Sequence, residues 1–449
     1  MERKKSGGAI VVGAVLGSLA VAGRAGGAVG TVLLVVVNSG SLTAQETAKK
    51  ALLEGWGYTV TPISASASQG TFDTSCLTSS CAYISCTVSS GTLDEKLTAT
   101  TIPVIVELDA QAVEMGFSSS TSSFTGKAID ITNTSHYITS TFASGSLSLF
   151  SSNQALRNLS GTTGNYTALG EKPSSSSVAL ALFERGDDMG GSHSGEIVPG
   201  RRVYLPWSGS TVDITKLTSN GQTLLQRTVE WCLMPVAWYK LDDAAGSTVV
   251  DSAGGYNGTR SGGAWTTGKF AGGLSFNGSN DYVSINNATA FQVTSALTIT
   301  GWVKATGAWG TGTDVDIVLR KGDANPNNWQ LAICNGKVEC LLDGNDDGGF
   351  KGNTTLSLNT WHHVAGTWDG AKVRIYVNGV LDNTPASKAA PIGTDTRAVY
   401  LGGRIGSTDV INGVEDDVRF YNRCLTAAEI AALAASGKPT IMSWENVAP

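Results

Sequence analysis

One stretch carries most of the information about the fold: Gly413-Val-Glu-Asp-Asp-Val-Arg-Phe-Tyr-Asn-Arg-Cys-Leu-Thr-Ala-Ala-Glu-Ile430. It closes a continuous pattern, from Val236 to Ala432, of short runs rich in β-branched and aromatic residues, which predict strands. These runs include Leu274 to Phe276, Tyr282 to Ile285, Leu297 to Lys304, Trp361 to Thr367, Val373 to Val377 and Ala398 to Leu401. Many short antiparallel strands at this spacing predict two packed sheets.

Asx-Gly pairs separate the predicted strands and supply the positive φ angles that tight hairpin turns need. They are Asn277-Gly278, Asn335-Gly336, Asp343-Gly344, Asp369-Gly370 and Asn378-Gly379. A two-residue turn at Asn335-Gly336 predicts that Cys334 pairs with Lys337 and that Leu331 pairs with Cys340. Those two cysteines are therefore not expected to form a disulfide.

The segment resembles the laminin-G-like, concanavalin A-like jelly-roll family of bacterial surface and secreted proteins. Besides the closing stretch, the resemblance rests on Trp238-Tyr-Lys-Leu-Asp-Asp-Ala-Ala-Gly-Ser247, Leu274-Ser-Phe-Asn-Gly-Ser-Asn-Asp-Tyr-Val283 and Trp361-His-His-Val-Ala-Gly-Thr-Trp-Asp-Gly370. It implies an all-β jelly-roll sandwich over residues 235–433, followed by a tail, 434–449. It also implies a binding or adhesion role on an extracellular ligand.

Length and composition fit a two-domain protein that does not bind nucleic acid. The 449 residues exceed the ~250 to 300 at which single cores stop growing. The net charge of −6 disfavours nucleic acids and anionic membranes as partners, because both attract basic surfaces.

Residues 1–29 read as an export signal. Arg3-Lys4-Lys5 form a basic region, Ala9 to Val21 form a short apolar stretch, and Ala20-Val21-Ala22 has the spacing that a signal peptidase accepts. An uncleaved N-terminal anchor is the alternative, since the uncharged run approaches the ~18 residues of a short membrane span. We therefore expect a secreted or cell-surface protein, with no membrane span after signal removal.

Residues 30–234 alternate predicted strands and helices. The apolar strand from Thr31 to Asn38 precedes a helix from Leu42 to Gly57, and the pattern predicts an α/β domain with a doubly wound, mostly parallel sheet. It resembles the flavodoxin-like and class I glutamine amidotransferase-like group. The strand from Ile102 to Leu108 runs into Asp109 without the cysteine or serine that such enzymes place there. The resemblance therefore implies a non-catalytic domain.

Three residues keep a catalytic alternative open in this domain. Cys86, His193 and Glu107 are the groups on which a hydrolase or amidase activity would depend, with the jelly roll as a targeting module. Cys86 also reads as a buried strand cysteine, and His193 also reads as part of a solvated glycine loop. A Cys76 to Cys81 bridge is plausible from spacing, whereas no cysteine and histidine spacing fits zinc.

The closing stretch lacks the acidic spacing of sandwich-fold glycosidases. Strand alternation predicts Glu415 and Asp417 on one face of the sheet and Asp416 on the other. No second carboxylate completes a catalytic pair beside them.

Calcium is the cofactor that the jelly-roll resemblance implies, near the first turn and the last strand. The matching positions are Asp251 and Asp417, with Asp242 or Asp416 as alternates. In the alternative interpretation Asp251 makes an Asx turn and Asp417 pairs with an arginine such as Arg419 or Arg404.

Carbohydrate binding needs an exposed aromatic ring with amides and carboxylates around it. Trp309 lies in a glycine loop and is the candidate platform, whereas Trp302, Trp361 and Tyr376 fall in strands and are expected in the core. The loop residues that could join Trp309 in a ligand-binding site are Asn325, Asn327, Asn328, Asp346 and Asp347.

Three functions thus remain open. The sequence favours an exported binding or adhesion protein whose jelly roll binds glycan or an extracellular protein, supported by calcium. A secreted hydrolase or amidase and a structural surface or matrix subunit are the alternatives.

Overall fold

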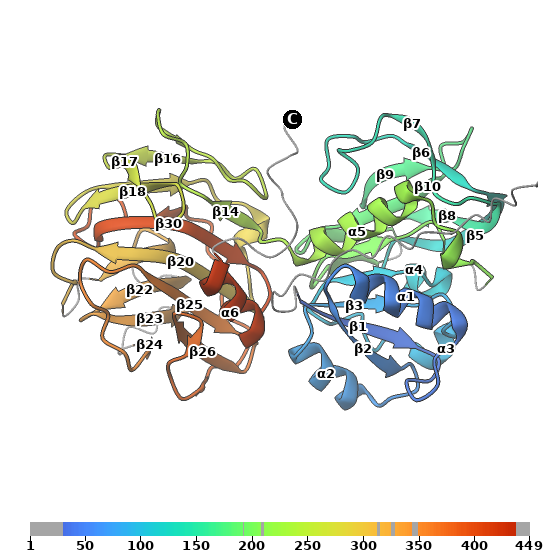
Figure 1. The fold of residues 1–449 in the computed structure, drawn as a ribbon, viewed down its shortest axis with the longest axis horizontal. Helices are drawn as coiled ribbons and strands as arrows, with labels where there is room; N and C mark the ends of the chain where they lie inside the picture. The colour runs from blue at the N-terminus through green and yellow to red at the C-terminus, as the bar shows by residue number, and fades with distance from the viewer. Residues whose placement is uncertain are drawn as a thin grey trace, which may run out of the picture.

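The computed structural model describes residues 30–191, 193–207, 211–311, 315–324, 328–343 and 349–436. These form two lobes, an N-terminal domain built on a mixed sheet and a C-terminal sandwich of two antiparallel sheets (Figure 1). The predicted leader, 1–29, lies outside the described residues, as does the predicted C-terminal tail from residue 437 on. Within the described ranges, no helix has the length and apolar character to cross a membrane.

The N-terminal sheet has nine strands in the order β2-β1-β3-β4-β13-β10-β9-β6-β7. Its parallel half comprises β1 (Thr31–Val36), β2 (Thr59–Ser64), β3 (Cys81–Ile84), β4 (Val104–Val106) and β13 (Arg202–Tyr204). Its antiparallel half comprises β6 (Ala128–Ile131), β7 (Gly145–Ser148), β9 (Thr167–Glu171) and β10 (Val178–Phe183).

The predicted doubly wound, mostly parallel sheet is therefore wrong. A parallel pair needs a crossover of a dozen or more residues, usually a helix, whereas hairpins join antiparallel strands directly. After α4 (Asp109–Glu114) the chain makes no further α-helix until α5 (Ser219–Leu233) within the described residues. The Ser/Thr-rich segment between them forms strands instead, including the β5 (Ser118–Gly126) and β8 (Gln154–Thr163) pair and the β11 (Asp188–Gly190) and β12 (His193–Ile197) pair.

Helices cover the parallel half of the sheet because its strands are apolar on both faces. Val32 and Leu34 of β1 pack with Leu53 of α1 (Ala44–Gly55), whereas Leu33 of the same strand packs with Phe72 of α2 (Gln69–Leu77). Thr43 starts α1 with a reciprocal capping box to Glu46. The short α3 (Ser90–Leu93) follows β3.

The jelly roll has a front sheet and a back sheet. The front sheet is formed by β14 (Ala237–Tyr239), β17 (Ala264–Thr267), β18 (Gly272–Asn277), β20 (Leu297–Ala305), β25 (His362–Trp368), β26 (Lys372–Val377), β27 (Val380–Leu381), β28 (Ala386–Ser387) and β30 (Asn412–Tyr421). The back sheet is formed by β15 (Thr248–Val249), β16 (Gly258–Ser261), β19 (Tyr282–Ile285), β21 (Asp316–Lys321), β22 (Trp329–Cys334), β23 (Lys337–Leu342), β24 (Phe350–Lys351) and β29 (Val399–Leu401).

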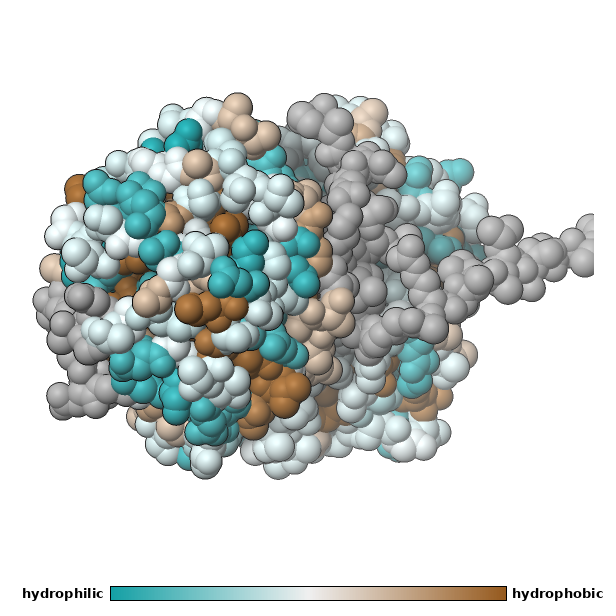
Figure 2. Space-filling model, turned by 60° about the vertical axis from the view of Figure 1, so that its left-hand side comes forward, coloured by the Kyte–Doolittle hydropathy of each residue, from teal (hydrophilic) through white to brown (hydrophobic). Residues whose placement is uncertain are grey.

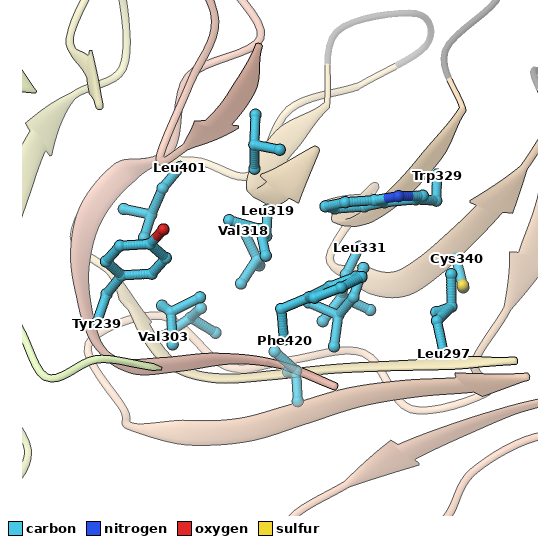
Figure 3. Packing of buried hydrophobic residues seen from close by; sticks show 14 of the residues in the cluster. Tyr239, Leu297, Val303, Val318, Leu319, Trp329, Leu331, Cys340, Leu401 and Phe420 are labelled. Atoms are coloured by element: carbon cyan, nitrogen blue, oxygen red, sulfur yellow. The ribbon is translucent and has the colours of Figure 1, made fainter. Parts of the chain in front are cut away.

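The core of the sandwich lies between these sheets. Phe420 of the front sheet stacks on Trp329 of the back sheet with 4.6 Å between ring centroids, and Leu331 and Val303 lie beside them (Figure 3). The Asn335-Gly336 turn gives the predicted register, because Cys334 pairs with Lys337 and Leu331 with Cys340. All seven cysteines are free, so the plausible Cys76 to Cys81 bridge is not formed.

The two domains meet through buried arginines. The Arg185 guanidinium donates to the carbonyl oxygens of Ala296 and Asn422, and to the Ser295 hydroxyl at 2.9 Å. From the other side, Arg423 donates to the Leu233 carbonyl at 3.2 Å. The helix α6 (Ala427–Ser436) follows and packs against the outside of the front sheet.

Candidate functional site

A β-bulge in β30 decides which carboxylates face the core. Trp302 of β20 pairs with Asp416 and Thr300 pairs with Arg419, so β30 has one residue more than β20 between these pairs. Asp417 takes a φ of 55°, the left-handed conformation of a bulge residue. Glu415 lies opposite Leu274 of the core and faces inward.

The bulge places Asp416 and Asp417 together on the outer face of the front sheet. The expectation that Glu415 and Asp417 share a face is therefore wrong, because strict alternation holds only in a regular strand. Trp302 is also placed outside the sandwich core, contrary to expectation, since it pairs with Asp416. A sequence signal for this irregularity exists in Gly301, a glycine within a strand that packs against Val418.

The outer face of the front sheet thus gathers six large side chains, which we call the outer-face cluster. They are Trp238, Trp302, His363, Asp416, Asp417 and Arg419. Sequence reasoning singled out the two aspartates as site residues and Arg419 as a possible partner, but not Trp238, Trp302 and His363, which come from other strands. The cluster therefore depends on strand pairing rather than on any local motif.

One half of the cluster is an ion pair under a tryptophan. Arg419 donates to Asp417 at 2.9 Å, and the Trp238 indole N–H donates to the same carboxylate oxygen. The Arg419 guanidinium lies 4.5 Å from the centre of the Trp238 ring, and Lys240 covers the ring at 4.5 Å. Arginine and lysine at these distances are held by cation–π attraction as well as by charge.

The other half is an acid beside an aromatic pair. Asp416 accepts backbone hydrogen bonds from Lys269 at 2.7 Å and Phe270 at 3.0 Å. Burial raises the pKa of Asp416 to about 7, and the neighbouring Asp417 carboxylate adds to the shift against these hydrogen bonds. Phe270 meets the Trp302 ring edge-on at 5.6 Å and is 43% exposed. An open aromatic ring therefore adjoins the buried polar groups.

The cluster also contains buried polar atoms that lack hydrogen-bond partners. The Trp302 indole nitrogen and the His363 Nδ1 are buried and have no hydrogen-bond partner among the described residues. Burial and the nearby Arg419 lower the pKa of His363 to about 3, so its ring is neutral at physiological pH. Buried polar groups are usually paired, so these two atoms are exceptions to the general pattern.

The four aspartates predicted to hold calcium are engaged by other donors. Asp251 accepts from the backbone N–H groups of Trp238, Ala253, Gly254 and Tyr256 at 2.8 to 3.0 Å, which is an extended Asx turn. Asp417 pairs with Arg419, and Asp242 accepts from the Gly272 N–H at 2.6 Å. No group of three or more metal-binding side chains occurs in the described ranges.

Of the residues predicted to bind carbohydrate, the structure describes Trp309 and Asn328. Its ring is half-buried against the core, and its indole N–H donates to the Leu356 carbonyl at 3.0 Å beside the Gly336 turn. Asn328 is buried at the opposite end of β22, where it donates to the Gly393 carbonyl. A strand of this length spans ~20 Å, so Trp309 and Asn328 cannot touch one sugar ring.

The remaining candidates lie elsewhere. Asn325, Asn327, Asp346 and Asp347 are outside the described residues. In the N-terminal domain Cys86 and Glu107 come together, because the Cys86 backbone N–H donates to the Glu107 carboxylate at 3.1 Å. His193 lies on β12 in a separate two-stranded sheet, with its Nδ1 3.2 Å from Glu196.

Comparison with known proteins agrees with the jelly roll and gives no support for a flavodoxin-like N-terminal domain. A search of curated proteins gave no match. Among solved structures, domain 4 of an extracellular arabinanase from Geobacillus stearothermophilus, in complex with arabinotriose, is 19% identical with a TM-score of 0.36. The alignment covers 44% of this chain and 98% of that one.

Two further solved structures align over a similar share of this chain. A sialidase from Trypanosoma rangeli in complex with sialic acid is 19% identical, with a TM-score of 0.36, and 32% of its length is covered. The receptor-binding domain of botulinum neurotoxin D is 17% identical, with a TM-score of 0.35, and 52% of its length is covered. The chain therefore spans about a third to a half of these two proteins. Residues 277–431 match the family described as the concanavalin A-like lectin/glucanases superfamily, and the C-terminal domain has that fold.

Proposed function

We propose that this protein binds carbohydrate through the outer face of its jelly roll. The observation that carries the proposal is an exposed ring, Phe270, beside buried hydrogen-bonding groups that lack partners, at Trp302 and His363. Sugars combine an apolar ring face with many hydroxyls, so they require this combination of an aromatic surface and fixed polar groups.

The wider surface supports a polar ligand. On the side of the molecule seen in Figure 2, hydrophilic and near-neutral residues predominate and hydrophobic residues form patches between them. The family match and the glycans named with the arabinanase domain and the sialidase point to the same ligand class. Acidic groups at Asp416 and Asp417 would accept hydrogen bonds from sugar hydroxyls.

The direct test is titration of the full chain with a glycan panel that includes arabinotriose and N-acetylneuraminic acid. Stacking on an aromatic ring contributes ~1 to 2 kcal/mol, so Phe270→Ala should weaken binding about tenfold. Ile405→Ala is the matched control, because Ile405 is a similarly exposed apolar residue away from the cluster. Binding unaffected by Phe270→Ala but abolished by Trp309→Leu would move the site to the Trp309 loop.

Calcium and export are further parts of the proposal. Repeating the titration with calcium and with a chelator tests whether a cation supports binding, and equal affinities in both would remove calcium from the account. Export rests on the basic and apolar residues before position 24. Recovery of the protein outside the cytoplasm with a new N-terminus near residue 23 would support it, and an intact N-terminus on cytoplasmic protein would contradict it.

A further inference from the structure

A cluster of reactive groups lies at the carboxyl ends of the parallel strands in the N-terminal domain, separate from the jelly roll. Cys86 follows β3, Glu107 follows β4, and Lys49 reaches them from α1. The Lys49 ammonium is 2.5 Å from the Glu107 carboxylate and 3.4 Å from the Cys86 sulfur. In open α/β sheets, this edge is where ligands commonly bind.

The carboxylate is fixed in place by several donors. Tyr83 donates to it through its hydroxyl, Trp207 donates through its indole N–H at 2.8 Å, and the Cys86 backbone N–H donates at 3.1 Å. All the side chains in this network are buried. Its geometry is therefore held before any ligand arrives, which is the condition for a site that works by preorganisation.

The sulfur has both partners that a nucleophile needs. The Glu107 carboxylate, which accepts a hydrogen bond from the Cys86 backbone N–H, is the group that can take the thiol proton. The Lys49 ammonium, which donates to the Cys86 sulfur at 3.4 Å, can stabilise negative charge. Burial, followed by the Glu107 carboxylate, raises the pKa of Cys86 to about 12. The resting group is thus a thiol that must lose its proton during attack.

The site is reached from a cleft. Cys86 lines it together with Thr87, Ser89, Ser90, Asp109 and Arg157. Within this lining Arg157 pairs with Asp109 at 3.0 Å, and the buried Arg157 Nε has no hydrogen-bond partner among the described residues. The cleft therefore offers hydroxyls and an arginine N–H to a small polar compound. The Cys86 sulfur is 3.4 Å from the Lys49 ammonium of the ion pair.

We propose that Cys86, Lys49 and Glu107 form a site for acyl transfer to water from a small polar amide or ester. The sulfur attacks the acyl carbon, its proton passes to Glu107, and the carbonyl electron pair moves onto oxygen near the Lys49 ammonium. Collapse expels the amine or alcohol, which takes the proton from Glu107. Water then attacks the thioester, and the acid and the free thiol are released.

The experiment uses 4-nitrophenyl acetate and the full chain. The expected result is a burst of about one nitrophenol per chain, with an acetyl group on Cys86 found by mass spectrometry after acid quenching. Cys86→Ala should remove the burst, whereas Cys76→Ser, a half-buried cysteine at the domain interface, should keep it. Absence of a burst, or a burst that survives Cys86→Ala, would overturn the proposal.

Two variants separate chemistry from structure. Glu107→Gln keeps an acceptor for Tyr83 and Trp207 but removes the base, so acetylation should slow at least tenfold and its pH profile should change. Lys49→Arg keeps the charge and should retain part of the rate. If either variant fails to fold, the position of the acetyl group on the wild-type chain still shows whether Cys86 is the nucleophile. Glycan binding by the jelly roll is a separate measurement, so failure of one proposal leaves the other standing.

Discussion

Two buried glutamates show how differently the two domains treat charge. Glu107 in the N-terminal domain accepts hydrogen bonds from Tyr83 and Trp207 and pairs with the Lys49 ammonium. Glu415 in the jelly roll is equally inaccessible, yet neither of its oxygens has a partner among the described residues. A buried charge is tolerated where it is compensated and is costly where it is not.

The two candidate sites differ in the same way, in whether their buried polar groups have partners. Around Glu107 in the N-terminal domain the polar groups are paired with one another, which fixes their geometry. In the jelly roll, Glu415 and Asp416 are carboxylates whose burial favours the protonated form, and Trp302 and His363 are left with unpaired atoms. The first arrangement is the one for which we propose chemistry, and the second is the one for which we propose a ligand.

The largest expected loss of folding stability comes from removing the cation of the Lys49–Glu107 ion pair. Lys49→Met would leave the Glu107 charge buried without its cation, which costs ~3 to 5 kcal/mol of folding free energy. Lys50→Met is the matched control, since Lys50 pairs with Glu54 on the surface of the same helix, and such pairs contribute only ~0.3 to 0.5 kcal/mol. If urea denaturation gave equal losses of unfolding free energy for Lys49→Met and Lys50→Met, the buried ion pair would contribute no more to stability than the surface pair.

The next effect is a pH dependence of jelly-roll stability. The pKa of Asp416 is about 7 in the folded protein and is near 4 in an unfolded chain, so folding favours its protonated form. The contribution of Asp416 to stability is therefore highest below pH 4 and falls as the pH rises toward 7, by up to about 4 kcal/mol.

Asp416→Asn should flatten this slope, because an amide does not titrate over this range. Denaturation of wild type and variant at pH 4.5 and 7.5 measures it. The change in unfolding free energy from pH 4.5 to pH 7.5 is compared between the two proteins. An equal change in wild type and Asp416→Asn would contradict the raised pKa of Asp416.

A smaller effect of opposite sign is expected at Glu415. Burial is the first cause that raises its pKa, and the Asp316 carboxylate adds to it. Glu415→Leu would remove an unpartnered carboxyl from an apolar site and should stabilise the jelly roll by ~1 to 3 kcal/mol at pH 7. This gain in stability should shrink toward pH 4, because the Glu415 carboxyl is then protonated in the unfolded chain as well. A destabilised variant at pH 7 would show that Glu415 has a stabilising partner.

The smallest effect tests a single donor to Glu107. Trp207→Phe keeps the aromatic packing and removes the N–H that donates to the carboxylate, which should cost ~1 to 2 kcal/mol. A loss well below 0.5 kcal/mol in thermal unfolding would mean that the remaining donors compensate fully.

The jelly roll could be predicted from sequence because its signals are local. Asn335-Gly336 alone predicted the register of β22 with β23, since the turn type fixes which residues pair. The mixed N-terminal sheet could not be predicted in the same way. Its antiparallel strands β6 and β9 come from a Ser/Thr-rich segment without a continuous apolar run, and pairing with distant strands decides their direction.

The candidate sites were harder to predict for a related reason. The sequence identified Asp416 and Asp417, but the bulge that turns both outward depends on the pairing of β30 with β20. Cys86 and Glu107 were candidates as single residues, whereas Lys49 was missed because it reaches them from a helix earlier in the chain. Local patterns predict strands and turns, and sites built across strands require the pairing itself.

The most direct test of carbohydrate binding by the outer-face cluster is the NMR resonance of the Trp302 indole N–H, assigned by comparison with Trp302→Phe. A hydroxyl of a bound glycan would give this unpaired N–H a partner, so its proton resonance should shift downfield as glycan is added, in step with binding. Glycan binding that leaves the Trp302 signal unchanged while the Trp309 indole shifts would contradict the account.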